Sequence, residues 1–303
     1  MHDAQHTALD AQHTPHDSGV SRRRLFGAGA VLGSTAAIAS TVAGAGPASA
    51  VVLGQEVDTG SLGITGLTVG RHTNLFRSFA LTSATGIGVI SVGTARYLVT
   101  FNAGDGHKAL QIFNADTGNV HYVASTPGET SGNWVHDGKG NLYFSSGNKL
   151  MHVSVPGRSI RQFGTAGTGI MEMYEFQIDH EGYLWAGTYP AGVLVRIHPD
   201  TGREVARTPP LGTGNKYARG LSISPDQKTV WSGTGTADPD LFRVDVDTPS
   251  APVRVSIPGR GRDSFVPQTV ALGRKVFVWH DNTAGDEIVS VYDVVSKTWS
   301  ASP

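Results

Sequence analysis

The side chains best suited to chemistry in this sequence are Tyr, Arg, Asn, Asp and His residues that stand in or beside turns. Removing the proton next to a sugar carboxylate needs a base such as His or Tyr, and an Arg to neutralise the developing charge. His72, Tyr217, Arg219 and His280 are candidates for these catalytic roles. Polar sugars need hydrogen-bonding groups for their hydroxyls and aromatic planes for their apolar faces. The candidate ligand-binding residues are Asn133, Tyr174, Tyr189, Tyr217, Arg219, His280 and Asp281.

Several other kinds of site are excluded by composition and spacing. The chain has no cysteine, so it has no disulfide, thiolate zinc site, iron-sulfur cluster, thiol nucleophile or acylated lipobox residue. Asp238-Pro-Asp240 and Asp245-Val-Asp247 offer fewer oxygens than the about six to eight that calcium takes. His180-Glu181 lacks the second histidine of a zinc-protease helix. We therefore expect neither a metal site nor a cofactor.

The charge balance bears on possible partners. The chain carries 24 Lys and Arg against 25 Asp and Glu, a formal net charge of -1. Nucleic-acid and membrane-surface proteins need a concentrated positive field. We therefore expect no nucleic-acid partner.

The N-terminal part has the pattern of an export signal. Ser21-Arg22-Arg23-Arg24-Leu25-Phe26 precedes a weakly apolar stretch rich in glycine and alanine, which ends in Pro47-Ala48-Ser49-Ala50. This pattern predicts a twin-arginine-type signal over 1–50, cleaved after Ala50, and an extracellular mature protein. The apolar run from Leu25 to Ala45 is about long enough for a transmembrane anchor. Its glycine, serine and threonine content favours cleavage, which would leave no stable membrane insertion.

An internal repeat organises the rest of the chain. The second strand-like segment of each unit has a bulky residue at Leu98, Tyr143, Trp185, Trp231 and Phe277, with spacings of 45, 42, 46 and 46. The third segment repeats independently, at Leu110, Leu150, Leu194, Leu241 and Ile288. A period in the forties with four short strands per unit is typical of propeller blades. We expect the bulky residues of the second strands, Tyr143, Trp185, Trp231 and Phe277, to fill the layers between blades.

The predicted fold is therefore an all-β propeller with about five recognisable four-stranded blades. Their ranges are 88–129, 130–170, 171–215, 216–263 and 264–303. Residues 51–87 would supply either a sixth blade or a strand that closes the ring against the last segment of the chain. If neither happens, the ring stays open and its strand edges are exposed to association.

Certain repeat units resemble known propeller families. Tyr292-Asp-Val-Val-Ser-Lys-Thr-Trp299 is similar to the end of a kelch blade, although the paired glycines are missing and no unit ends in Trp-Asp. The run 183–202, followed by Tyr217-Ala-Arg-Gly-Leu221, looks like blades of long actinobacterial secreted propellers. Residues 88–303 thus resemble secreted bacterial β-propeller repeats of the kelch, WD40 and quinoprotein-like group. The blade number is too small for the usual quinone-binding members, and some propellers of similar build are polysaccharide lyases.

Three functions fit these observations. Propellers place ligands on one face, made by the loops between blades and those between second and third strands, and the candidate ligand-binding residues fall in such loops. We expect a binding module for extracellular glycan or cell-wall polymer. A carbohydrate-active enzyme similar to a polysaccharide lyase, on the same face, is the first alternative. A protein-interaction scaffold is the second.

Overall fold

The computed structural model describes residues 83–104, 107–126, 133–165, 167–262 and 264–301. These residues form strands and turns, without a helix, so no segment among them is a membrane-spanning helix. The strands fall into five sheets. They are β1 (Ser83–Val92), β2 (Ala95–Gly104), β3 (His107–Asn114) and β4 (Val120–Ser125); β5 (Trp134–His136), β6 (Asn141–Ser146), β7 (Lys149–Ser154) and β8 (Ser159–Thr165); β9 (Glu172–Ile178), β10 (Leu184–Tyr189), β11 (Leu194–Ile197) and β12 (Glu204–Arg207); β13 (Tyr217–Ile223), β14 (Thr229–Gly235), β15 (Leu241–Asp245) and β16 (Val253–Val255); β17 (Gln268–Leu272), β18 (Lys275–Asp281), β19 (Glu287–Asp293) and β20 (Thr298–Ala301).

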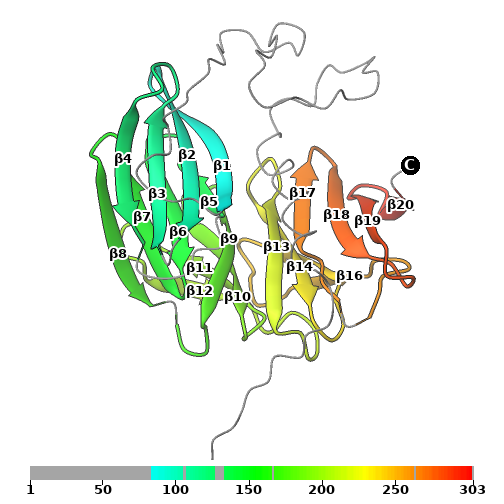
Figure 1. The fold of residues 1–303 in the computed structure, drawn as a ribbon. Helices are drawn as coiled ribbons and strands as arrows, with labels where there is room; N and C mark the ends of the chain where they lie inside the picture. Colours follow the sequence, from blue (N-terminus) through cyan, green and yellow to red (C-terminus); the bar gives the residue numbers. More distant parts are fainter. Residues whose placement is uncertain (1–82, 105–106, 127–132, 166, 263, 302–303) are drawn as a thin grey trace, which may run out of the picture.

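Each sheet is an antiparallel meander in which four strands pair in the order of the chain. Figure 1 shows the first two sheets in cyan and green on one side, the last two in yellow to red on the other, and β9 to β12 between them. This confirms the predicted all-β fold with five four-stranded blades. The first blade begins at Ser83, five residues before the expected boundary at 88. The predicted signal segment 1–50, and residues 51–82 of the segment expected to add a blade or close the ring, lie outside the described residues.

The turns follow from residue type. After β3, the side-chain oxygen of Asn114 accepts the backbone N–H groups of Asp116 and Thr117, at 3.0 and 2.9 Å. Gly118 then takes a φ of 71°, which residues with a side chain rarely adopt. The side chain of Asn114 and the backbone conformation of Gly118 thus favour a chain reversal between β3 and β4.

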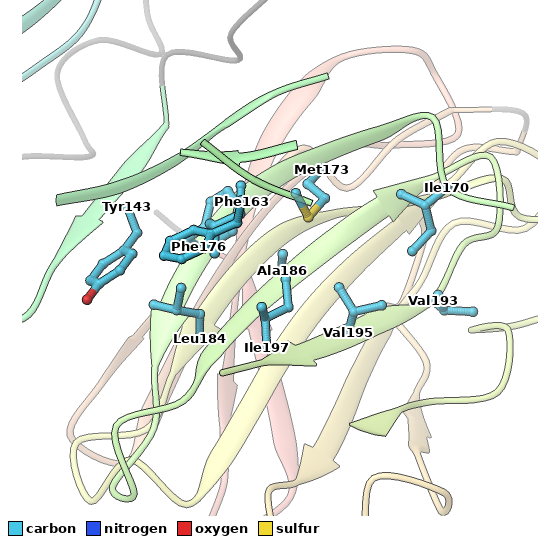
Figure 2. Close-up of a cluster of buried hydrophobic side chains, with 11 residues drawn as sticks. Tyr143, Phe163, Ile170, Met173, Phe176, Leu184, Ala186, Val193, Val195 and Ile197 are labelled. Carbon is cyan, nitrogen blue, oxygen red and sulfur yellow. The ribbon is translucent and has the colours of Figure 1, made fainter. Parts of the chain in front are cut away.

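The hydrophobic core consists of layers between consecutive sheets. Figure 2 shows the layer between the second and third sheets, where Tyr143 and Phe163 meet Phe176 and Leu184. Leu184 is fully buried and Phe176 is 2% exposed. The apolar faces of neighbouring blades exclude water from each other, which provides the main stabilisation of the stack.

Three of the four bulky second-strand residues fill such layers, as predicted. Tyr143 lies between the second and third sheets, Trp185 packs in the cluster shared with the fourth sheet, and Trp231 in the cluster shared with the fifth. Phe277 is the exception, because it is half-buried and belongs to none of these clusters. It lies on the opposite side of β18 from Val276 and Val278, which pack towards the fourth sheet. The expectation for Phe277 was wrong because the fifth sheet is the last one, so only one of its faces has a partner within the described chain.

A buried carboxylate ties the third sheet together. Asp179 follows β9, and its side chain has no exposed surface. It accepts hydrogen bonds from Trp185 Nε1 at 2.9 Å and from Arg196 Nε at 2.7 Å. It also accepts the backbone N–H groups of Glu181 and Tyr183, both at 3.0 Å. One charge thus satisfies donors from the β9–β10 turn, β10 and β11.

Candidate functional site

Four aromatic rings from the third, fourth and fifth blades meet near the starts of the first strands of these blades, β9, β13 and β17. We call Tyr174, Tyr189, Tyr217 and Phe265 the tyrosine cluster. Tyr217, the first residue of β13, stacks on Tyr189 at the end of β10, with ring centroids 4.4 Å apart and planes 30° apart. Its ring also lies 5.8 Å from that of Tyr174 and 5.1 Å from the edge-on ring of Phe265. Tyr217 is therefore the centre of the cluster.

β-Bulges direct the polar side chains of this region. Ala186 pairs with Phe176 and Thr188 with Met173, so Tyr174 and Glu175 together oppose Gly187 alone. The register of β13 shifts in the same way at Arg219 and Gly220. A bulge places two consecutive residues opposite one and re-aims their side chains. As a result Tyr174, Glu175 and Arg219 all remain half-buried, while Met173 and Phe176 are buried in the core.

One cation and two carboxyl groups lie beside the tyrosine cluster. The guanidinium carbon of Arg219 lies 5.5 Å from the ring centroid of Tyr174, within the range of a cation–π contact. Glu172 accepts the hydroxyl hydrogen of Tyr174 at 2.6 Å, and Glu175 accepts the backbone N–H of Leu221 at 2.6 Å. Among the residues that the structure describes, Arg219 forms no ion pair. Its charge is therefore open to an incoming anion or hydroxyl.

Tyr174 and Tyr217 act as neutral hydroxyls at neutral pH. Burial, followed by the hydrogen bond to Glu172, raises the pKa of Tyr174 far above its ordinary value of 10.0. Burial also raises the pKa of Tyr217, with further contributions from Tyr189 and Glu172. A phenolate base is thus disfavoured at both positions, whereas a hydroxyl that donates and accepts hydrogen bonds is favoured.

Burial brings the pKa of Glu175 close to neutral pH. Its side chain keeps some accessible surface, although protein atoms crowd its carboxyl group. This burial raises the pKa of Glu175 from 4.5 to about 8, against the opposing effects of the Leu221 N–H and the Arg219 charge. Most Glu175 carboxyl groups therefore hold a proton at pH 7. A carboxyl with such a pKa is suited to proton transfer near neutral pH.

The Glu175→Gln variant should change how stability depends on pH. Below about pH 4.5 the carboxyl is protonated in both folded and unfolded chains, so the two proteins should be similarly stable. As the pH rises from 4.5 towards 8, the Glu175 carboxyl loses its proton readily in the unfolded wild type but not in the folded protein. The free energy of unfolding of the wild type therefore falls relative to that of the variant. Above pH 8 the variant should be more stable by a few kcal/mol, since one pKa unit is worth about 1.4 kcal/mol. Urea unfolding at pH 5 and pH 9 measures this difference, and a gap that does not widen with pH contradicts the assignment.

A glycine allows the third and fourth sheets to approach each other beside the cluster. A Cβ added at Gly187 on β10 would overlap the backbone oxygen of Ala218 on β13. Ala218 stands between Tyr217 and Arg219, so this contact sets where both side chains lie. The close approach therefore positions the stacked pair of Tyr189 and Tyr217.

We expect Gly187→Ala to push β13 away from β10 and destabilise the protein by about 1–3 kcal/mol, as overpacking does. It should also weaken ligand binding at the cluster. Chemical denaturation measures the first effect and a binding titration the second. Gly164→Ala on β8 is the matched control, because its added Cβ would meet no atom within 4 Å. Equal stability of the two variants would show that the approach at Gly187 is not tight.

The structure brings together four of the candidate residues and places the others elsewhere. Tyr174, Tyr189, Tyr217 and Arg219 converge as described above. His280 is 1% exposed on β18, with Nε2 at 2.9 Å from Ser290 Oγ and Nδ1 at 2.9 Å from Asp281 O. Asp281 ends β18 and Asn133 precedes β5, and both are half-buried. His72 lies outside the described residues.

Three residues of the site were missing from the sequence-based candidates: Glu172, Glu175 and Phe265. The signal for Glu175 was a charged residue inside the apolar strand segment Met173-Tyr-Glu-Phe-Gln-Ile178. Phe265 stands three residues before β17, the first strand of its blade, and pairs with Gly235 in an isolated bridge. A search of inner-strand starts for aromatic residues would have found it.

The acidic residues considered for calcium have other partners. Asp238 and Asp240 pair with Arg254 at 2.6 and 2.5 Å, and Asp238 also pairs with Arg260 at 2.5 Å. Within the described ranges, one group of side chains lies close enough to hold a metal ion, with ligand atoms within 4.8 Å of one another: His180, Glu181 and Asp247. All three are exposed, and Glu181 is already paired with Arg196 at 2.5 Å. A cation there would have to displace that arginine.

Comparison with known proteins supports the fold. No protein-family model matches the chain, and no curated protein matches it in sequence. Among solved structures it is similar to a catalytically inactive variant of virginiamycin B lyase from Staphylococcus aureus with quinupristin, with a TM-score of 0.51 and 10% identity over 73% of this chain and 84% of that one. It is also similar to the extracellular domain of the putative hybrid two component system BT4673 from B. thetaiotaomicron, with a TM-score of 0.51 and 13% identity over 74% of this chain.

The aligned region makes up 34% of the BT4673 domain, so the chain spans about a third of that structure. At these identities the likeness concerns the fold and not the activity. Both neighbours are β-propeller proteins. Together with the five four-stranded sheets, they show that this chain is a β-propeller.

Proposed function

We propose that the protein is a secreted β-propeller that binds extracellular glycan or cell-wall polymer at the tyrosine cluster. The observation that carries the proposal is the stacked, half-buried pair Tyr189 and Tyr217 with Arg219 beside it. A sugar ring has apolar C–H faces and a rim of hydroxyls. The aromatic rings suit the faces, while Arg219, Glu172 and the tyrosine hydroxyls suit the rim.

The rest of the chain agrees with an extracellular role. The sequence pattern over 21–50 is that of a twin-arginine-type signal with cleavage after Ala50. Export by that route carries a protein that is already folded, which suits a chain without cysteine. One of the structural neighbours is itself an extracellular domain. These points support the proposed localisation.

One observation favours a second candidate function, a polysaccharide lyase. Glu175 has a pKa near neutral pH, and the positive charge of Arg219 acts to lower that pKa. In its ionised form Glu175 would take the proton next to a uronate carboxylate, and Arg219 would neutralise the charge that develops on that carboxylate. The bond between the sugar ring carbon and the glycosidic oxygen would then break as a double bond forms in the ring, and the leaving oxygen would take the proton that Glu175 had removed. Glu175 replaces His or Tyr as the base, since Tyr174 and Tyr217 hold their protons firmly.

The test is to incubate residues 51–303 with neutral polysaccharides, uronic-acid polysaccharides and cell-wall sacculi. Retention by each polymer is measured together with the ultraviolet absorbance of unsaturated products. Retention without products supports the binding module, and products that disappear in Glu175→Gln support the lyase. Neither retention nor products with any polymer would contradict both carbohydrate functions and leave the protein-interaction scaffold.

A further inference from the structure

A cavity of about 940 Å³ opens between the fourth and fifth sheets. It is bordered by the β13–β14 turn at Ser224 and the β17–β18 turn at Gly273. Tyr217 begins β13 and Ser224 follows its end, so the cavity and the tyrosine cluster lie at opposite ends of a strand about 20 Å long. The cavity is therefore separate from the site described above.

Two rows of side chains line it. On the fourth sheet, Trp231, Arg243 and Val253 are directly paired across β14, β15 and β16. On the fifth sheet, the row runs through Ala271, Val276, Tyr292 and Trp299 across β17 to β20. All seven residues line the cavity. The wall is thus set by strand register and not by a mobile loop.

The aromatic residues form a ladder from the core to the opening. The ring centroids of Trp231 and Tyr292 are 5.9 Å apart, and those of Tyr292 and Trp299 are 5.1 Å apart. Trp231 is 4% exposed and Tyr292 8%, whereas Trp299 is only half-buried. The outer part of the ladder therefore offers aromatic surface to a ligand in the cavity.

The rim is positively charged. Arg243, Lys275 and Lys297 line the cavity and are exposed, and none of them forms an ion pair with another described residue. The fourth cation of the lining, Arg254, is neutralised by Asp238 and Asp240. Only one carboxylate, that of Asp226, is among the described residues that line the cavity. It accepts hydrogen bonds from Ser224 Oγ and Lys228 N.

We infer that this cavity binds a small aromatic anion, with its ring against Trp299 and Tyr292 and its carboxylate or sulfonate at the rim formed by Arg243, Lys275 and Lys297. The volume is in the range of about 300–1,000 Å³ that small-molecule sites have. The apolar wall accounts for affinity, and the charged rim accounts for the preference for an anion. The inference is independent of the tyrosine cluster and of glycan binding.

The test compares 2-naphthoate with 2-naphthamide, which has nearly the same shape but no charge. Isothermal titration calorimetry of the full chain should show naphthoate binding at least about tenfold more tightly, with the difference shrinking at high salt. The double variant Arg243→Glu/Lys297→Glu should lose at least about tenfold in naphthoate affinity and change naphthamide affinity less than about threefold. Arg203→Glu, an exposed arginine in the third blade, is the matched charge control and should change neither.

A second variant tests the aromatic wall. Trp299→Ser should weaken both compounds alike, because it removes ring surface and not charge. Unfolding curves check that each variant is folded before its titration is interpreted. Equal affinity of wild type for the two compounds, absence of binding, or unchanged naphthoate binding in the double charge variant would each overturn the inference.

Discussion

Tyr217→Ala is expected to reduce affinity for the proposed glycan ligand about 30-fold while the propeller remains folded. Tyr217 contacts each of the other three rings of the tyrosine cluster, so its removal takes away the central stacking surface. A central aromatic anchor in a binding site is worth about 2 kcal/mol or more, and every 1.4 kcal/mol is about tenfold in affinity. Isothermal titration with the polymer retained most strongly in the panel measures the change.

Tyr217→Phe is the matched control for this variant. It keeps the ring that stacks on Tyr189 and removes only the hydroxyl, so its affinity should stay within about fivefold of wild type. Since a hydrogen bond contributes about 1 kcal/mol, a larger loss would mean that the hydroxyl dominates. A folded Tyr217→Ala protein with wild-type affinity would show that the glycan binds elsewhere.

Asp179→Ala is expected to have the largest effect on stability, a loss of about 3–5 kcal/mol. The substitution leaves the Trp185 N–H, the Arg196 guanidinium and two backbone N–H groups without their common acceptor. The charge of Arg196, largely buried, would then keep only Glu181 as a partner. Guanidinium chloride unfolding measures the free energy of unfolding.

Asp200→Ala serves as the comparison, because Asp200 is an exposed turn residue of the same blade. Exposed substitutions of this kind usually change stability by less than about 0.5 kcal/mol. If Asp179→Ala and Asp200→Ala were equally stable, the buried carboxylate would not hold the third sheet together. Loss of all soluble Asp179→Ala protein, with Asp200→Ala normal, would agree with the expected effect.

The repeat in the sequence was sufficient to predict the blades. Leu110, Leu150, Leu194 and Leu241 are all fully or almost fully buried at equivalent places in the third strands. Packing between blades demands an apolar side chain at that position in every unit, so the requirement is visible as a period. The expectation failed at Phe277, where the last sheet has no following partner within the described chain.

The site could be predicted only in part. Tyr174, Tyr189, Tyr217 and Arg219 were recognised as aromatic and basic residues near the expected blade loops. The structure places Tyr174 within β9 and Arg219 within β13, and not in the loops themselves. The β-bulges opposite Gly187 and Gly233 were not predicted, because a one-residue shift in strand register has no signal in the residue types of the sequence. The bulge brings Glu175 to the same side as Tyr174, against the simple alternation of a strand. His280 shows the reverse case, because a polar residue near a loop can be a buried partner of its own sheet.

The most direct test of the central claim is hydroxyl-radical footprinting of the tyrosines with and without bound glycan. Residues 51–303 are oxidised alone and in the presence of the polymer that the panel retains, and oxidation of each tyrosine is measured by mass spectrometry. Binding at the tyrosine cluster predicts that Tyr189 and Tyr217 are protected, while Tyr183, in the turn at the other end of β10, reacts at an unchanged rate. Unchanged oxidation of Tyr189 and Tyr217 under conditions where the polymer is bound would contradict it.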